Sequence, residues 1–514
     1  MRSARVAPPV RSWLGWILVP LLAFLALGSW ALSSPVGATP DEDYHLTSIW
    51  CGLGEREPFC EPGDTSIEKS VPATVLQASL CFAFRSDASA ACQTGMYDDE
   101  SSPLVSTERG NFQGDYPPGF YFASGLLASE GSYAASVVMM RLMNAAIFVI
   151  MLSVAARLLP RELRFPLIGS VLGASVPLVV FLVPSINPTS WAITSAATLW
   201  ITLLGAARAT TARQRWSLMA VAIVAAVLGV SSRGDSAAFV AIGAFVAVLL
   251  HWKWTERPFV SLLLPGVAAV AGFLGFLGSS QTDSVSEGLP GAGGEPLPPS
   301  VLLGSNFIEM PGLYLGALGG DEIGWGDTPL PSTVLFASFA VVVALAVVGA
   351  GALWRRKVAA IAVVLVLLIA LPMVIFYSSN ATVGNLVQPR YMLPLMIVLI
   401  GLLLLPPPGG LRPTRVLAIS AALMLSSAQS IALHTNLRRY VTGLDAVGWN
   451  LDIDAEWWWP IAVSPNGVWI IGSLCFGAVA VVLAYLASER RLTEAPRRRP
   501  ADDPSARPLA PVTP

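Results

Sequence analysis

Residues 355–378 read RRKVAAIAVVLVLLIALPMVIFYS, which is three basic residues followed by 21 residues without a charge. A helix needs about 20 mostly apolar residues to cross the hydrocarbon core of a bilayer. Lys and Arg beside such a segment favour the cytoplasmic side of the membrane. This stretch therefore predicts a transmembrane helix that starts in the cytoplasm and ends outside.

The same pattern recurs along the whole chain. Of the 514 residues, 54% are hydrophobic and only 12% are charged, about half the share of charged residues in soluble domains. This composition excludes a soluble enzyme and a disordered or fibrous chain. It predicts an all-α polytopic membrane protein of about twelve transmembrane helices, at 13–33, 132–156, 166–184, 188–207, 216–232, 236–252, 259–278, 332–353, 358–378, 391–406, 416–434 and 466–487. We interpret the first segment as an uncleaved helix, because its apolar run is long for a signal peptide and eleven more spans follow.

The basic residues predict the orientation. With the N-terminus in the cytoplasm, 22 of the 31 basic residues lie inside, eight lie outside and one, Arg141, lies within a span, whereas 27 of the 33 acidic residues lie outside. We therefore expect a cytoplasmic N-terminus at 1–12, a transmembrane domain at 13–487 with external loops at 34–131, 279–331 and 435–465, and a disordered cytoplasmic tail at 488–514. The net charge of −2 gives no nucleic-acid-binding signature.

Four of the five cysteines lie in the first external loop, on the side of the membrane where disulfides persist. Four cysteines allow three connectivities. We expect the local pairs, Cys51–Cys60 and Cys81–Cys92.

Acidic residues and a histidine open this first loop. Asp41, Glu42, Asp43 and His45 follow the first span by a few residues, and Pro40 favours a helix that starts at Asp41. One of the carboxylates could act as a general base toward a hydroxyl group. Asp41, Asp43 and His45 could instead hold a divalent metal ion, which stays open. The alternative is helix capping with a solvated acidic face.

Further polar residues occur near the external ends of the predicted helices. Asp115 and Tyr116 precede a predicted interfacial helix, and Asp115 is expected to face the same cavity as Asp41. Arg141 interrupts an apolar helix, where a charge normally faces a partner or a water-filled cavity. Arg233 and Arg390, the latter followed by Tyr391, can either extend to the interface or bind a lipid phosphate.

Three strings resemble motifs of one bacterial family. Asp41-Glu42 with His45 is similar to its Pro-Asp-Glu-x-x-His motif after the first span, and residues 324–331 (GWGDTPLP) resemble its Gly-Trp-x-Asp-Thr-x-x-Pro segment. Residues 388–394 (QPRYMLP) resemble its Gln-Gly-Arg-Tyr-x-x-Pro segment, with Pro389 in place of glycine. The family consists of polytopic membrane proteins of unknown function and is grouped with the GT-C glycosyltransferases. The strings occur in family order, and the resemblance covers most of residues 14–487.

The resemblance implies a GT-C-like fold and an activity. Such enzymes transfer a sugar from a polyprenyl-phosphate donor to an acceptor at the external face, with a carboxylate in the first external loop. Asp41 is then the leading candidate base with Glu42 as alternative or helper, Arg390 contacts the donor phosphate, and His45 and Asp327 support the site. The expected acceptor is an envelope glycan or glycolipid, the expected location is the bacterial plasma membrane, and some relatives use a divalent cation.

Two other functions fit the same number of spans. A transporter or flippase for a lipid-linked glycan would place ionisable groups near the bilayer midplane, where Arg141 could line its pathway. The second of these functions is that of a non-catalytic scaffold of an envelope-assembly complex. The glycosyltransferase hypothesis requires that Asp41 and Arg390 meet in one pocket at the external rim of the bilayer.

Overall fold

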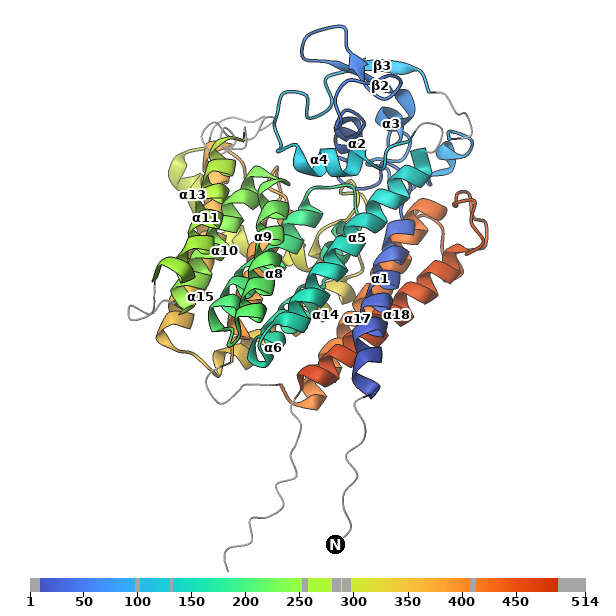
Figure 1. Ribbon diagram of the computed structural model, residues 1–514. Helices are drawn as coiled ribbons and strands as arrows, with labels where there is room; N and C mark the ends of the chain where they lie inside the picture. The colour runs from blue at the N-terminus through green and yellow to red at the C-terminus, as the bar shows by residue number, and fades with distance from the viewer. Residues whose placement is uncertain are drawn as a thin grey trace, which may run out of the picture.

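The computed structural model describes residues 10–97, 102–129, 133–251, 258–279, 288, 297–406 and 413–488. Within these residues the protein is a bundle of long helices with a small mixed α/β cap at one end (Figure 1). Most of the predicted cytoplasmic N-terminus, and the predicted tail after residue 488, lie outside the described residues.

The bundle follows the predicted spans closely. Its helices are α1 (Val10–Leu32), α5 (Tyr133–Leu158), α6 (Arg161–Ala174), α7 (Pro177–Leu182), α8 (Thr189–Arg208), α9 (Ala212–Val230), α10 (Gly234–His251), α11 (Pro258–Leu277), α13 (Pro299–Leu315) with the π-turn η2 (Gly316–Gly320), α14 (Ser332–Ala350), α15 (Arg355–Ser378), α16 (Leu393–Leu403) after the 3₁₀ turn η3 (Pro389–Met392), α17 (Arg415–Val441) and α18 (Pro465–Ala487). Within the described residues, ten helices are long and apolar enough to cross a membrane, and nine of these ten coincide with predicted spans.

The other three predicted spans are also helical, although two of them are divided. Segment 166–184 is divided between α6 and α7, because Val176 is extended before Pro177 and a residue before proline avoids helical geometry. Segment 391–406 becomes η3 and α16, and segment 259–278 is α11. The protein is thus a helical multi-pass membrane protein, as the composition predicts.

The tenth apolar helix, α13, lies inside the predicted external loop 279–331. The Asn306 side chain donates to the Ala381 carbonyl, just beyond the end of α15 at Ser378. The Tyr314 hydroxyl donates to the Leu368 carbonyl. Leu368 lies ten residues before Ser378, which is about 15 Å deeper in the bundle at the usual helical rise. The backbone then reverses at Gly319, where φ is 104°. From these contacts we infer that α13 enters the bundle partway and returns to the same side, so that both ends of this loop stay on one face.

The cap is formed by the first loop. It contains α2 (Glu42–Trp50), α3 (Ala73–Gln77), the 3₁₀ turn η1 (Ala91–Gln93), α4 (Gly119–Gly125) and an antiparallel sheet of β1 (Glu61–Pro62), β2 (Lys69–Pro72) and β3 (Leu104–Thr107), in which Ser70 pairs with Glu61 and with Ser106. Both expected disulfides, Cys51–Cys60 and Cys81–Cys92, are present. The predicted interfacial helix after Pro118 is α4.

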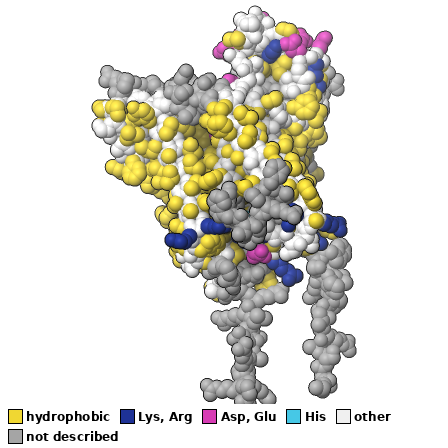
Figure 2. Space-filling model, turned by 60° about the vertical axis from the view of Figure 1, so that its left-hand side comes forward, with side chains coloured by type: hydrophobic (Ala, Val, Ile, Leu, Met, Phe, Trp, Pro, Cys, Tyr) yellow, Lys and Arg dark blue, Asp and Glu magenta, His cyan; other side chains and the backbone are white. Residues whose placement is uncertain are grey.

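Charged groups divide between the two ends of the molecule. In the view of Figure 2, hydrophobic side chains cover the middle, Asp and Glu gather on the cap, and Lys and Arg gather at the opposite end. The described ends of the chain, at α1 and α18, both lie at that opposite end (Figure 1). This arrangement agrees with an even number of crossings.

A buried lysine closes the end of the bundle opposite the cap. Lys357 Nζ donates to carbonyls at the end of α14, those of Gly349 and Ala352, at 3.1 and 2.9 Å. It also donates to the carbonyls of Leu403 and Leu405 at the end of α16, at 2.7 and 3.1 Å. A cation at helix C-termini satisfies carbonyls that have no partner within the helix and complements the helix dipole.

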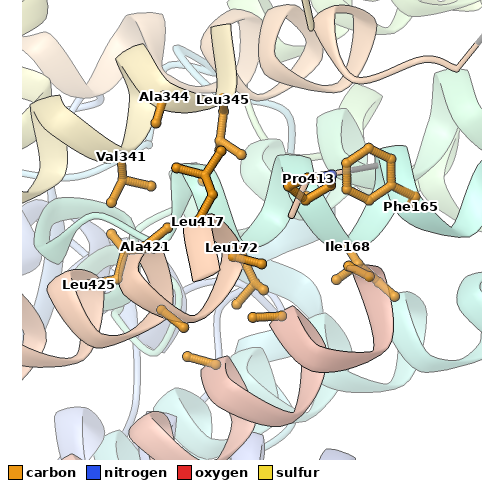
Figure 3. Close-up of a pocket in the computed structure, with 17 residues that line it drawn as sticks. Phe165, Ile168, Leu172, Val341, Ala344, Leu345, Pro413, Leu417, Ala421 and Leu425 are labelled. Atoms are coloured by element: carbon orange, nitrogen blue, oxygen red, sulfur yellow. The ribbon is translucent and has the colours of Figure 1, made fainter. Parts of the chain in front are cut away.

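An apolar cavity also lies in the membrane part. Its empty space is about 540 Å³ when the space at its open side is included, and α6, α14, α17 and α18 line it with side chains such as Phe165, Leu172, Val341 and Leu425 (Figure 3). Near it α17 begins and α18 ends, so the cavity lies toward the end of the bundle that is far from the cap. Its hydrocarbon lining supplies no group for acid–base chemistry.

Candidate functional site

Asp41 lies where the cap meets the bundle. It precedes α2 with a φ of 57°, a left-handed conformation that Asp tolerates better than most residues. Arg390 Nη2 donates to its Oδ2 at 2.7 Å, although the two residues are 349 positions apart. On the solvent side, Arg109 Nη2 lies 3.6 Å from Oδ1, and the Asp41 side chain is 44% exposed. Asp41 is thus held between two guanidinium groups and still reaches solvent.

Arg390 approaches Asp41 from the bundle side. It belongs to η3, directly before α16, and is 7% exposed. Within the described residues, its Nε is buried and has no hydrogen-bond partner. An unmade hydrogen bond of this kind is costly in a buried position. The guanidinium therefore has an unused donor beside Asp41.

A second arginine lies close to Arg390. Arg233 precedes α10 and donates from Nε and Nη2 to the two oxygens of Asp235, at 2.8 and 3.0 Å. Its guanidinium lies 4.9 Å from the Tyr391 ring centre, and that of Arg390 lies 5.4 Å from the same ring. The ring of Tyr116 is 5.7 Å from Arg233. Both arginines also sit at helix N-termini, which favour anions. Such a pair can bind a phosphate.

The charges around Asp41 determine its ionisation. Burial alone would raise the pKa of this carboxyl, but the positive charges of Arg390 and Arg109 outweigh burial, so the pKa of Asp41 lies below its ordinary value. Asp41 is therefore an ionised carboxylate at neutral pH. As long as both arginines face it, it is a weak base.

Aromatic rings surround His45, which lies in α2 four residues after Asp41. The His45 Nδ1 atom is 3.0 Å from the Tyr121 hydroxyl, and the rings of Tyr44 and Tyr116 meet the imidazole edge to face. Burial lowers the pKa of His45 to about 3, so the imidazole is neutral at neutral pH. The Tyr44 hydroxyl donates to Asp115 at 3.0 Å. His45, Asp115 and Tyr116 thus form one polar and aromatic wall beside Asp41.

Glu42 is held differently from its neighbour. It is fully buried, and its Oε2 accepts from the Thr39 amide and hydroxyl, both at 2.7 Å. Arg141 Nη2 donates to both of its oxygens, at 2.9 and 3.1 Å. The hydrogen bonds of the Glu42 carboxylate are thus all used within the protein, by Thr39 and Arg141. This geometry argues against the sequence-based suggestion that Glu42 is an alternative base.

The same contacts explain the arginine within the second span. Arg141 is 1% exposed and also donates to the carbonyls of Ala31, Ser34 and Pro35. Its partners lie at the cap end of α1 and in the segment that leads to Asp41. Arg141 therefore fastens the start of the cap and does not line a water-filled pathway.

The suggested metal ligands do not converge. Arg109 binds both oxygens of Asp43, at 2.8 and 3.0 Å, and His45 faces Tyr121. Among the residues that the structure describes, no group of three or more His, Cys, Asp or Glu side chains could hold a metal ion. The suggestion that Asp41, Asp43 and His45 form a metal site is corrected accordingly.

The Gly-Trp-x-Asp-Thr segment at 324–328 contacts the chain that leads to Asp41. The Trp325 indole donates to the Gly37 carbonyl at 2.8 Å, four residues before Asp41. Asp327 Oδ2 accepts from Arg439 at 2.8 Å and from the Phe84 amide at 3.0 Å. Asp327 is 6% exposed. It thus ties the second loop to the cap and to α17, and its contacts are those of a structural residue.

Sequence reasoning missed two of these arginines. Arg109 and Arg439 were counted only as basic residues on the external side, where such residues are few. That scarcity was the available signal, because a basic residue retained on the acidic face needs a local partner.

Comparison with known proteins gives a family but no activity. No curated protein matches the sequence. Among solved structures, the chain is similar to ArnT from Cupriavidus metallidurans bound to undecaprenyl phosphate, with 12% identity and a TM-score of 0.39 over 92% of this chain and 78% of that one. This likeness is too distant to assign an activity. The profile of the predicted membrane protein family DUF2142 matches residues 24–399, almost three quarters of the chain, and the protein therefore belongs to that family.

Proposed function

We propose that the protein is a membrane glycosyltransferase that moves a sugar from a polyprenyl-phosphate donor to an envelope glycan or glycolipid at the external face of the bacterial plasma membrane. The observation that carries the proposal is the contact of Asp41 with Arg390. A base and a phosphate-binding group lie side by side, half-open to solvent, at the junction of bundle and cap. The resemblance of the three strings to a family grouped with GT-C glycosyltransferases supports the same reading.

The chemistry follows from these groups. The acceptor hydroxyl oxygen attacks the anomeric carbon of the sugar while the bond from that carbon to the phosphate oxygen breaks, with inversion. The hydroxyl proton passes to the Asp41 carboxylate, which acts as general base. Polyprenyl phosphate leaves with one more negative charge than it carried as a diester. Arg390 and Arg233 stabilise that charge.

The remaining polar residues would shape the pocket. Neutral His45, Tyr116 and Tyr391 present faces and edges of rings beside Asp41, and Asp115 orients Tyr44. A lipid donor also accounts for the extent of the bundle, since a polyprenyl chain must reach the site from the bilayer. The charge distribution of Figure 2 and the disulfides of the cap support an external location for the cap and cytoplasmic termini.

The transporter alternative loses the residue that was suggested to line its pathway. Arg141 is buried against Glu42 and three carbonyls. Arg233, Arg390 and Asp41 lie instead at the cap end of the bundle.

The test is sugar transfer in proteoliposomes that contain the full chain and undecaprenyl phosphate carrying a radiolabelled hexose or pentose, with envelope lipid extract as acceptor. We expect transfer by the parent protein and a loss of about 100-fold or more for Asp41→Asn, as for removal of a general base. Glu55→Gln is the matched control, because it removes an exposed carboxylate of the same loop that, among the described residues, pairs only with Lys69. Unchanged transfer by Asp41→Asn would remove Asp41 from the mechanism.

A further inference from the structure

Asp41 cannot fulfil two roles at once. In the structure it is the counter-ion of Arg390, whereas the proposed reaction needs it as a base. A carboxylate that is paired with a buried guanidinium has a lowered affinity for protons. Something must therefore separate the two groups before Asp41 accepts a proton.

We propose that Asp41 and the phosphate of the lipid donor compete for Arg390, so that binding of the phosphate releases Asp41 and switches on the base. The inference deepens the proposed function and rests on it for the identity of the ligand as a prenyl phosphate.

The three arginines of the site show where the competition occurs. Arg109 and Arg233 each use the Nε and Nη2 edge of the guanidinium to bind both oxygens of one carboxylate. Arg390 uses the same edge differently, since only Nη2 reaches Asp41 and Nε is buried without a partner among the described residues. The edge of Arg390 is thus half occupied.

A phosphate fits this edge better than Asp41 does. Its oxygens can accept from Nε and Nη2 together, the bidentate geometry in which guanidinium groups bind phosphates most strongly. Asp41 cannot easily do the same, because its left-handed backbone and the bond from the Asn187 amide to the Pro40 carbonyl fix the direction of the chain. Phosphate binding would therefore satisfy a donor that the resting site leaves open.

The other charges of the site do not relieve this competition. Arg233 already binds Asp235 and Arg109 already binds Asp43, each through its Nε and Nη2 edge, so neither edge is open to the phosphate. Once the phosphate takes Arg390, Asp41 keeps only the more distant Arg109, at 3.6 Å. Its burial then raises the pKa, and the carboxylate becomes a better base. The base would be active only when the donor is bound.

The inference makes a prediction of unusual sign. If Asp41 merely orients Arg390, its replacement weakens phosphate binding. If Asp41 competes with phosphate, Asp41→Asn strengthens binding, because the amide leaves Arg390 without a counter-ion. Asn also tolerates the left-handed backbone, so the variant keeps the local conformation.

The experiment measures binding by the purified full chain in lipid nanodiscs, with farnesyl phosphate, farnesol and inorganic phosphate as probes in calorimetry. We expect Asp41→Asn to bind farnesyl phosphate roughly fivefold more tightly, the scale of one partly exposed ion pair of about 1 kcal/mol. We expect Arg390→Gln to lose that binding and Glu55→Gln, which makes the same change of net charge, to leave it unchanged. An equal gain in affinity for inorganic phosphate would show that the site recognises the phosphate alone. A gain in affinity confined to farnesyl phosphate would show that the site also recognises the lipid chain.

Weaker or unchanged binding by Asp41→Asn, with an unaltered melting temperature, would overturn the inference. Equal binding of farnesol and farnesyl phosphate by the parent protein would overturn it as well. None of these measurements involves transfer of a sugar. Tighter binding by Asp41→Asn without transfer by any variant would therefore refute the proposed function and leave the competition intact.

Discussion

Replacement of Glu42 by Gln separates the two adjacent carboxylates that the sequence could not distinguish. Glu42 accepts from two donors of Thr39 and from Arg141, all in a fully buried position. Glutamine offers only one acceptor oxygen, and its amide nitrogen would face donors. Arg141 would then be a buried cation without its counter-ion.

The size of the effect can be worked from these contacts. Removal of one partner of a buried ion pair costs about 3–5 kcal/mol. Arg141 keeps its bonds to three carbonyls, those of Ala31, Ser34 and Pro35. We therefore expect the lower part of this range, about 3–4 kcal/mol, and a fall in melting temperature of roughly 3–4 °C, since the entropy of unfolding of 514 residues is about 1 kcal/mol/K.

The assay is thermal unfolding of the purified chain in detergent, in a cycle of Glu42→Gln, Arg141→Met and the double variant. The double variant should lose clearly less free energy of unfolding than the two single variants lose together, because it buries no unpaired charge. Should Glu42→Gln melt within 1 °C of the parent while sugar transfer collapses, Glu42 would act in the chemistry and our reading of this pair would be refuted.

Two further predictions concern the wall and the support of the site. Burial lowers the pKa of His45 from 6.5 to about 3, so the protein should lose stability as the pH falls below about 6.5. The lowered pKa of Asp41 causes a loss of stability only below pH 3.8, its ordinary value. Melting curves between pH 7.5 and 5 should therefore be flatter for His45→Gln, and an equal slope would contradict the assignment. Arg439→Met should leave Asp327 buried without its cation, and hydrogen exchange should rise in residues 81–92. Unchanged protection there would show that the pair does not hold the cap.

Much of the fold could be predicted because it depends on features that are local in sequence. Nine predicted spans coincide with long apolar helices, since twenty apolar residues leave the backbone no alternative to a helix inside a bilayer. Helix α13 could not be predicted in the same way. It carries Asn306, Glu309 and an internal Pro311, and no basic cluster marks either end. Whether such a segment crosses or returns depends on contacts with α15, which the sequence does not reveal.

The site could be predicted only in outline. Two of the three strings contain Asp41 and Arg390, but the sequence could not tell which of Asp41 and Glu42 faces Arg390. That choice depends on one left-handed residue, Asp41, which directs its own side chain toward Arg390 while Glu42 turns into the protein. Asp327 was expected to be a supporting residue, but the sequence could not identify its partner Arg439, which lies 112 residues away.

Basic residues that break the orientation rule prove to be the most informative ones. Four of the eight basic residues on the cap side are buried, namely Arg233, Arg390, Arg438 and Arg439, whereas Lys357 is the only buried one on the opposite side among the residues whose burial is described. An arginine on the acidic face does not help to orient the chain in the membrane. Each buried one must instead be stabilised by local partners, such as Asp235, Asp41, the backbone carbonyls beside α17, or Asp327. Arg390 and Arg439 both have a buried Nε without a partner among the described residues, but the Asp327 side chain beside Arg439 is 3% exposed, whereas the Asp41 side chain beside Arg390 is 44% exposed. That combination of an incomplete arginine and a half-exposed carboxylate is what singles out this corner of the molecule as the place for chemistry.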